Sequence, residues 1–251
     1  MSRAPAVAWL RRARPLLGTL VEIGIGGAND DGSTAFDAAF SRLREIELCL
    51  SRFEADSDVS RFHALGRGER MTMRASMREV LEAANQLRVA TAGRFDLSVG
   101  SAPEGWRCRG DELCKLDVAT RLDLGGIGKG YAVDRAVEAL EAKGCVAGWV
   151  NAGGDLRVFG DADVPIRLRD ESHGGVRTFA SLRDGAFATS HFHAGSRSRL
   201  ARTSGAPPAA AHVSVAAPLC LWADALTKVV ALGGDADDPV LARYEAVAWV
   251  H

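Results

Sequence analysis

The apolar positions along this chain follow two different periods. Between Leu16 and Ile25, every second residue from Thr19 onward falls on one face, which predicts a strand with one buried side. From Ser33 to Leu50, apolar residues recur three or four positions apart, which predicts an amphipathic helix. The short polar and glycine-rich run between these two segments is typical of a turn.

Three further helices are predicted by the same spacing. The first begins at a capping box formed by Ser76 and Glu79, and Gly93 is a natural stop for it. The second runs from about Tyr131 to Lys143 and follows a glycine-rich loop. The third covers Trp222 to Leu232. We expect these helices to pack against strands through their apolar faces.

The second half of the chain is richer in predicted strands. Cys145 to Asn151 is an apolar run that leads into the tight turn NAGGDL, and strand-like pieces continue to Ser190. Two more strands are expected at His212–Ala217 and Tyr244–Val250. We interpret residues 51–72, 101–121 and 195–211 mostly as loops, and we find neither repeats nor a domain-splitting linker. The order of elements favours a single α+β domain over residues 1–251.

Composition excludes several classes of protein. The net charge is −1 over 251 residues, which gives no argument for binding nucleic acid or an anionic membrane. The five cysteines are scattered and form no C-x-x-C pair, which favours reduced thiols over disulfides or a zinc knuckle. No apolar run has the length of a membrane span or the flanks of a signal peptide. We therefore expect a cytoplasmic protein without membrane insertion.

The chemistry of the chain centres on the stretch LDLGGIGKGYAVDRAVEAL, residues 122–140. Glycines allow close backbone approach to a ligand, and a helix that follows such a loop presents amide groups and a positive dipole end, which suits phosphate. Lys129 adds a positive charge. The spacing fits neither a P-loop nor the G-x-G-x-x-G dinucleotide fingerprint. A nucleotide diphosphate site is our hypothesis, and a tight turn without a ligand is the alternative.

Further polar motifs lie at the ends of predicted elements, where sites are usually built. In chain order they are LLGT, SRFEADSDVSRF, TAGRFDLSVG, LDLGGIGKGYAVD, VNAGGDLRVFG, ATS and ADALTK. Taken together, this ordered set resembles the FAD:protein FMN transferase (ApbE) family over nearly the whole chain. The resemblance implies a T-fold-like α+β architecture with mixed, mostly antiparallel sheets and packed helices.

The resemblance also implies an activity. FAD would be the substrate, with Mg²⁺ at its diphosphate, and the FMN half would pass to a Thr or Ser hydroxyl of an acceptor flavoprotein, releasing AMP. Phosphoryl transfer of this kind depends on positioning and on neutralising phosphate charge. Two alternatives share the same site: a non-catalytic FAD-binding homologue, and a pyrophosphatase that splits FAD into FMN and AMP.

The motifs assign roles to individual residues by resemblance. Those that would contact the cofactor are Phe53, Arg94, Phe95, Asp96, Asp123, Lys129, Thr189 and Ser190. Those that would hold the metal are Gly126, through its carbonyl, Asp224 and Thr227. No general base is assigned. Several also have a purely structural interpretation: Phe53 as a core aromatic, Asp96 and Asp123 as turn residues, and Asp224 as a charge that complements a helix dipole.

The chain departs from the family pattern in its C-terminal third. Lys228 stands where the family usually has Thr, four residues after the metal-binding aspartate, so we expect weaker metal dependence. The family's His-x-x-Asp-Pro-x-Thr-Gly stretch is not recognisable, and His63 stands where Asn is usual. Alternation also places His191 and His193 on one side of a strand, so a histidine-based metal site is a further hypothesis.

Overall fold

The largest element is a seven-stranded sheet with the order β1-β2-β6-β7-β10-β11-β12. The computed structural model describes residues 9–26, 32–169, 174–192 and 208–251. All neighbouring strands in this sheet pair antiparallel, which confirms the mixed α+β class with antiparallel sheets. The strands are β1 (Trp9–Leu16), β2 (Thr19–Gly26), β6 (Ala147–Ala152), β7 (Asp155–Phe159), β10 (Gly185–His191), β11 (His212–Ala217) and β12 (Val247–Val250).

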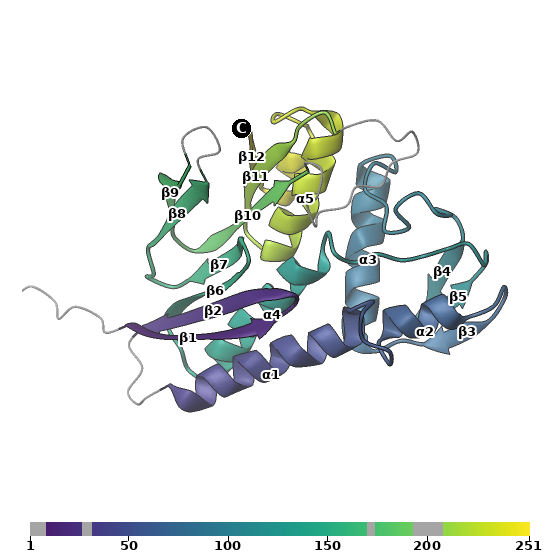
Figure 1. Cartoon of the computed structure of the whole chain (residues 1–251), viewed down its shortest axis with the longest axis horizontal. Coiled ribbons are helices and arrows are strands. Elements are labelled where there is room, and N and C mark those ends of the chain that lie inside the picture. The colour runs from purple at the N-terminus through teal and green to yellow at the C-terminus, as the bar shows by residue number, and fades with distance from the viewer. Residues whose placement is uncertain (1–8, 27–31, 170–173, 193–207) are drawn as a thin grey trace, which may run out of the picture.

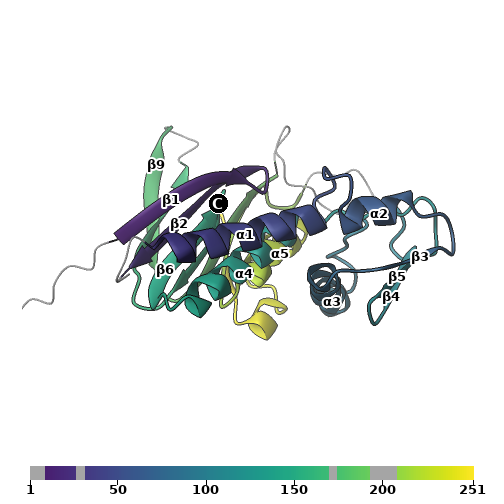
Figure 2. The same cartoon turned by 90° about the horizontal axis from the view of Figure 1, so that it is seen from below.

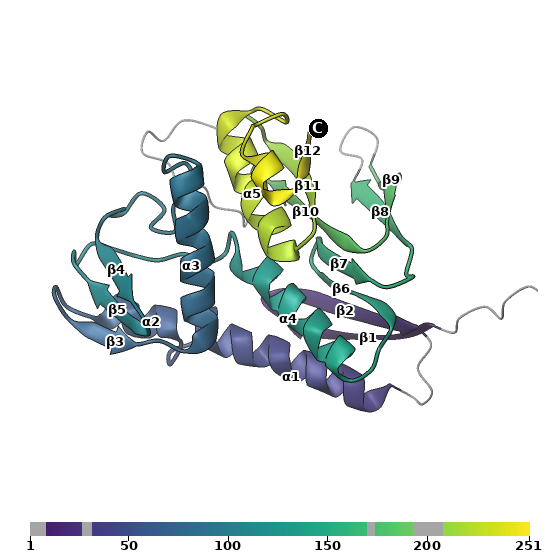
Figure 3. The same cartoon turned by 180° about the vertical axis from the view of Figure 1, so that it is seen from behind.

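Three helices cover one face of this sheet (Figures 1 and 3). They are α1 (Ser33–Leu50), α4 (Gly128–Ala142) and α5 (Cys220–Gly233). Helix α1 packs on α4, α4 on α5, and α5 on strands β10 and β11. The bounds of α1 are those predicted, and its apolar stripe is buried. Within the described parts of the chain, no helix is long and apolar enough to cross a bilayer.

The opposite face of the sheet is covered by a hairpin of β8 (Val164–Arg169) and β9 (Val176–Leu182). Ile166 and Leu168 of this hairpin pack with Trp149, Val158 and Phe187 of the sheet in a second, smaller apolar cluster. Because side chains alternate along each strand, the same strand contributes some side chains to the core under the helices and others to this smaller cluster. The predicted strand-like pieces between residues 164 and 190 are confirmed.

A small lobe lies beyond the C-terminal end of α1 (Figure 2). It contains α2 (Asp58–Ala64), β3 (Arg70–Thr72), α3 (Ala75–Ala90), β4 (Trp106–Arg109) and β5 (Glu112–Lys115), with the sheet order β3-β5-β4. The sequence prediction of loops at 51–72 and 101–121 was wrong for this lobe. Its strands have only three or four residues, too few for alternation to become visible.

The predicted capping box of α3 was also wrong. The N-cap is Arg74, which makes no side-chain cap, and Ser76 lies inside the helix. Instead, Glu79 accepts a hydrogen bond of 2.8 Å from the Tyr131 hydroxyl. Among the other boundaries, α4 begins at Gly128, three residues earlier than expected, and the closing strand begins only at Val247, after a 3-10 turn.

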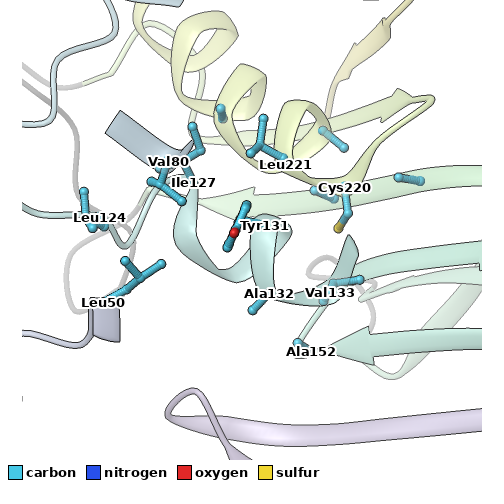
Figure 4. Packing of buried hydrophobic residues seen from close by; sticks show 14 of the residues in the cluster. Leu50, Val80, Leu124, Ile127, Tyr131, Ala132, Val133, Ala152, Cys220 and Leu221 are labelled. Atoms are coloured by element: carbon cyan, nitrogen blue, oxygen red, sulfur yellow. The ribbon is translucent and has the colours of Figure 1, made fainter. Parts of the chain in front are cut away.

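Helices α4 and α5 approach each other closely in the core, since a Cβ at Gly130 would overlap the Cys220 carbonyl. Figure 4 shows Ile127, Tyr131 and Val133 along α4 with Cys220 and Leu221 of α5 above them. Asp134 of α4 caps α5, because its two carboxylate oxygens accept the amides of Cys220 and Leu221 at 2.9 and 2.8 Å. Burial nevertheless raises the pKa of Asp134 to about 6. This cap fixes the start of α5 relative to the middle of α4.

His63 of α2 ties the small lobe to the segment before the glycine loop. Its Nε2 lies 2.9 Å from the amide nitrogen of Leu122 and 3.1 Å from the carbonyl oxygen of the same residue. Burial, together with the positive charges of Arg121 and Lys115, lowers the pKa of His63. The neutral imidazole is therefore the form that the fold favours.

We predict that Gly130→Ala strongly destabilises the protein, whereas Gly128→Ala does not. A Cβ at Gly130 would overlap the backbone carbonyl of Cys220 and lie 2.9 Å from Cβ of Asp224. At Gly128 the nearest atom would be Cβ of Leu124 at 3.7 Å, an ordinary contact. Urea unfolding should show a loss of about 2–4 kcal/mol for the first variant. Equal stability of the two variants would contradict the close helix approach.

We predict that His63→Asn flattens the pH dependence of stability below about pH 6.5. The folded-state pKa of His63 is below its ordinary value of 6.5, so the unfolded chain takes up the proton first. The free energy of unfolding therefore falls as the pH drops below 6.5, and the variant lacks this contribution. The difference between variant and parent is measured by urea unfolding at pH 5, 6 and 7.5. If the free energies of unfolding of variant and parent differ by the same amount at all three pH values, His63 is not the source of the pH dependence.

Candidate functional site

A cavity of about 500 Å³ is lined by residues from the C-terminal end of α1, the start of α4 and the C-terminal half of α5. Figures 1 and 3 show the arrangement of these three helices. This volume is within the range of small-molecule sites. The turn between β1 and β2 and the segment 94–99 close its sides. The structure brings six of the eight predicted cofactor residues to its lining: Phe53, Arg94, Phe95, Asp96, Asp123 and Lys129.

Phe53 stands at the rim of this cavity. Its exposed fraction is 84%, so the interpretation as a core aromatic is wrong. The guanidinium of Arg52 lies 4.7 Å from the centre of the Phe53 ring, and its Nη1 is 3.1 Å from Oδ2 of Asp123. Arg52 was missed by the sequence analysis, although its place next to Phe53 in the SRF motif was a signal. It connects the aromatic rim to the glycine loop.

The segment 94–99 supplies the opposite wall. Arg94 is paired with Asp238, and this hydrogen bond lowers the pKa of the Asp238 carboxyl. The oxygens of Asp96 accept the amide of Ser98 at 2.9 Å and its hydroxyl at 2.5 Å. Asp96 therefore shapes a turn, as the structural interpretation proposed, and also lines the cavity. Phe95 is buried and presents only part of its surface.

The glycine loop uses several of its own amides. The amide of Gly125 donates a hydrogen bond of 2.9 Å to Oδ1 of Asp123. The amide of Gly128 donates one of 2.7 Å to the carbonyl oxygen of Leu124. The amide of Gly130 donates to Asp224 at 3.2 Å. The loop thus offers fewer amides to a phosphate than its composition suggested. What it presents to the cavity is the dipole of α4 and the charge of Lys129.

Four charged side chains lie together beside the loop, and three of them, all but Lys129, are buried. Lys129 pairs with Asp155 of β7, and Lys228 pairs with Asp224 one turn earlier in α5. Both carboxylates are almost fully buried. Burial alone would raise the pKa of Asp224, but the charges of Lys228 and Lys129 outweigh it and the pKa is lowered. Burial would lower the pKa of Lys129, but Asp155 and Asp224 raise it.

The predicted metal residues include Asp224, a member of this set, and in this arrangement they do not fit a divalent cation. The two carboxylate oxygens of Asp224 are engaged by Lys228 and by the amide of Gly130. The hydroxyl of Thr227 lies 2.8 Å from that of Ser190 and donates to the Asp224 carbonyl at 2.7 Å. Lys228 itself occupies the space between Asp224 and the loop at Gly126. The magnesium assignment stays a prediction.

Thr189 and Ser190 are separated by the alternation of β10. Ser190 faces α5, where its Oγ meets Thr227 and lies 3.1 Å from Nζ of Lys228. Thr189 points to the other face of the sheet, where its hydroxyl lies 3.0 Å from that of Ser214. It lines a second cavity, of about 750 Å³, beneath the β8–β9 hairpin. The structure therefore brings neither residue to the lining of the first cavity.

The histidines give no metal centre in the described part of the chain. His191 stacks on His212 with ring centres 3.9 Å apart, and His193 lies outside the described residues. No three His, Cys, Asp or Glu side chains among the described residues are arranged to hold a metal. The histidine-based site therefore gains no support. The stretch that would correspond to the family's His-x-x-Asp-Pro-x-Thr-Gly motif also lies mostly outside the described residues.

Known proteins resemble this chain in sequence. An FAD:protein FMN transferase of Rhodobacter capsulatus is 28% identical over an alignment of 207 residues, which covers 68% of this chain and 39% of the relative. The chain thus spans less than half the length of that curated relative.

Solved structures resemble it in fold. The flavin transferase ApbE of Vibrio cholerae superposes with a TM-score of 0.84 at 20% identity, over 98% of this chain and 94% of that one. The apo form of the Pseudomonas stutzeri flavinyl transferase ApbE gives 0.81 at 24% identity, over 98% and 92%. The ApbE protein of Thermotoga maritima gives 0.81 at 22% identity, over 94% and 90%.

The profile of the ApbE family matches residues 17–115 and 108–249. These two segments contain all the motifs on which the sequence resemblance was based except the first residue of LLGT. They also contain every residue that lines the first cavity. The chain therefore belongs to the ApbE family.

Proposed function

We propose that this chain binds FAD in the first cavity and transfers its FMN half to a Thr or Ser hydroxyl of an acceptor flavoprotein, releasing AMP. The observation that carries the proposal is the cavity itself, which joins an exposed aromatic rim to a helix N-terminus and two lysines. Family membership and the name of the Rhodobacter capsulatus relative support the same activity.

The flavin would lie at the rim. An exposed phenyl ring is a natural platform for a planar ring system, and the cost of exposing Phe53 in the free protein is recovered when a ligand covers it. Asp123 lines the same wall, and by the family resemblance its carboxylate would accept a hydrogen bond from the flavin. Arg94, Phe95 and Asp96 would border the bound molecule on the other side.

The diphosphate would lie at the inner end, near Lys129. The N-terminal end of α4 and the side chains of Lys129 and Lys228 line this part of the cavity, so the helix dipole and two cationic side chains lie near it. In the transfer, the acceptor hydroxyl oxygen forms a bond to the phosphorus of the FMN half, and the bond to the bridging oxygen breaks. AMP leaves with that oxygen, and the hydroxyl proton passes to a base. No histidine lines the described cavity, so no base is assigned.

A second candidate function is a non-catalytic FAD-binding protein. The position of Lys228 against Asp224 favours it, because the residues expected to hold magnesium are occupied by a side chain. We also infer a cytoplasmic location, which is supported by the five cysteines, since none of them forms a disulfide in the described part of the chain.

Incubation with FAD and an acceptor flavoprotein domain, with and without Mg²⁺, tests the proposed transfer. Mass spectrometry should find FMN attached to the acceptor and AMP in solution. An acceptor with its target Thr or Ser replaced by Ala is the control. Free FMN without a modified acceptor would indicate a pyrophosphatase instead. FAD that binds but stays intact would support the non-catalytic function.

We predict that Phe53→Ala weakens FAD binding about tenfold or more, because stacking on an aromatic contributes about 1–3 kcal/mol per base. The melting temperature should stay the same, since the ring is mostly exposed. Val89→Ala, which removes an exposed apolar side chain from α3, is the matched control and should leave affinity unchanged. Calorimetric titration with FAD measures both. Unchanged affinity in Phe53→Ala would place the flavin elsewhere.

A further inference from the structure

We propose that the ammonium group of Lys228 takes the place that the family resemblance gives to a divalent metal ion, so that this chain holds the FAD diphosphate without a metal. The inference rests on the proposed FAD site. It concerns a residue of this chain that the family pattern does not contain, and it follows from how the structure places that residue.

Lys228 is held in a cage of oxygens. Its Nζ contacts Oδ1 of Asp224, and it lies 3.0 Å from the Asp224 carbonyl oxygen and 3.1 Å from Oγ of Ser190. An ammonium group has three donors, and these three acceptors use all of them. Carboxylate, carbonyl and hydroxyl oxygens are also the ligands that Mg²⁺ prefers. The chain has therefore built a cation site and filled it with its own side chain.

The alkyl part of Lys228 fills the space between α5 and the glycine loop. A Cβ built on Gly126 would lie 3.3 Å from Cε of Lys228 and 3.6 Å from its Cδ and Cγ. A metal that joined the Gly126 carbonyl to Asp224 would therefore have to displace this side chain. The lysine is only 6% exposed, so its stem would have to leave a packed position.

The charges of the set balance without a metal. Two ammonium groups, of Lys129 and Lys228, face two carboxylates, of Asp155 and Asp224. A divalent cation added to this set would meet two positive charges at short range in a partly buried place, where repulsion is strong. Replacing Lys228 by the neutral hydroxyl of threonine would instead leave Asp224 short of a partner and open the place for Mg²⁺.

Because all three donors of Lys228 are used, it acts on a diphosphate through its charge and not through a direct hydrogen bond. It lines the inner end of the same cavity as Lys129. By neutralising Asp224, it removes the repulsion that this buried carboxylate would exert on an anionic ligand in a partly enclosed cleft. The expected consequence is FAD binding that does not depend on added Mg²⁺.

Calorimetric titration with FAD in EDTA and in excess Mg²⁺ tests this on the unaltered protein. The two dissociation constants should agree within about twofold, which is much less than the tenfold change that 1.4 kcal/mol would give. Binding that weakens tenfold or more in EDTA would overturn the proposal. Absence of FAD binding in both conditions would instead count against the FAD site itself.

Three variants separate charge from structure. Lys228→Thr should bind FAD at least about tenfold more weakly in EDTA and recover in Mg²⁺, and Lys228→Arg should stay independent of Mg²⁺. Lys143→Thr, which removes an exposed lysine from the end of α4, is the control and should behave like the parent. A Lys228→Thr protein whose affinity stays unchanged in EDTA would overturn the role of the charge.

A titration of the parent protein with Mg²⁺ alone tests the same point without a nucleotide. The parent protein should give no binding heat and no rise in melting temperature, because its cation place is filled. Lys228→Thr, if folded, should gain a site with both signals. Mg²⁺ binding to the parent that Asp224→Asn abolishes would overturn the proposal, because it would show a metal at Asp224 beside the lysine.

Discussion

The carboxylate of Asp224 is the constraint on which the inner half of the molecule depends. It is fully buried in α5, so its charge needs partners inside the protein. One oxygen is matched by Lys228 of the same helix and the other by the amide of Gly130 at the start of α4. A glycine is required there because a Cβ would overlap the backbone of Cys220. The same carboxylate thus fixes both the helix contact and the wall of the cavity.

The cavity collects residues from distant parts of the chain because several interactions cross between elements. Arg52 holds Asp123 of the glycine loop, His63 meets the backbone of Leu122, and Arg94 pairs with Asp238. Each of these joins the small lobe or its connections to the helical layer. The lobe therefore does more than extend the fold, since it supplies the rim against which a ligand would lie.

Much of the fold could be predicted from sequence. Helix α1 and strand β11 have the predicted bounds, because their patterns are long or clearly limited by turns. Within the small lobe, helix α3 could be predicted from its apolar spacing, whereas the strands could not, since they are too short to show a period. The capping box at Ser76 failed because tertiary contacts decide the ends of a helix, and Glu79 finds Tyr131 instead.

The candidate site, like the fold, could be predicted from sequence only in part. Motif order placed Phe53 and Asp123 at one cavity, which local pattern alone could not do. It could not show which of Thr189 and Ser190, which alternate along a strand, faces helix α5, nor which partner Asp224 takes. The face of a strand that meets a helix depends on strand register, and the partner of Asp224 depends on the charge balance among Lys129, Asp155 and Lys228. Register and charge balance are both determined by contacts between distant segments of the chain.

The position of Lys228 one helical turn after Asp224 has a consequence for how occupancy of the site is set. A dissolved ion fills a site according to its concentration in the medium, whereas a tethered group is present at a high effective concentration that the chain itself determines. Every folded copy therefore carries one cation at this place, in fixed stoichiometry. Occupancy follows folding, and it is insensitive to the ionic composition around the protein.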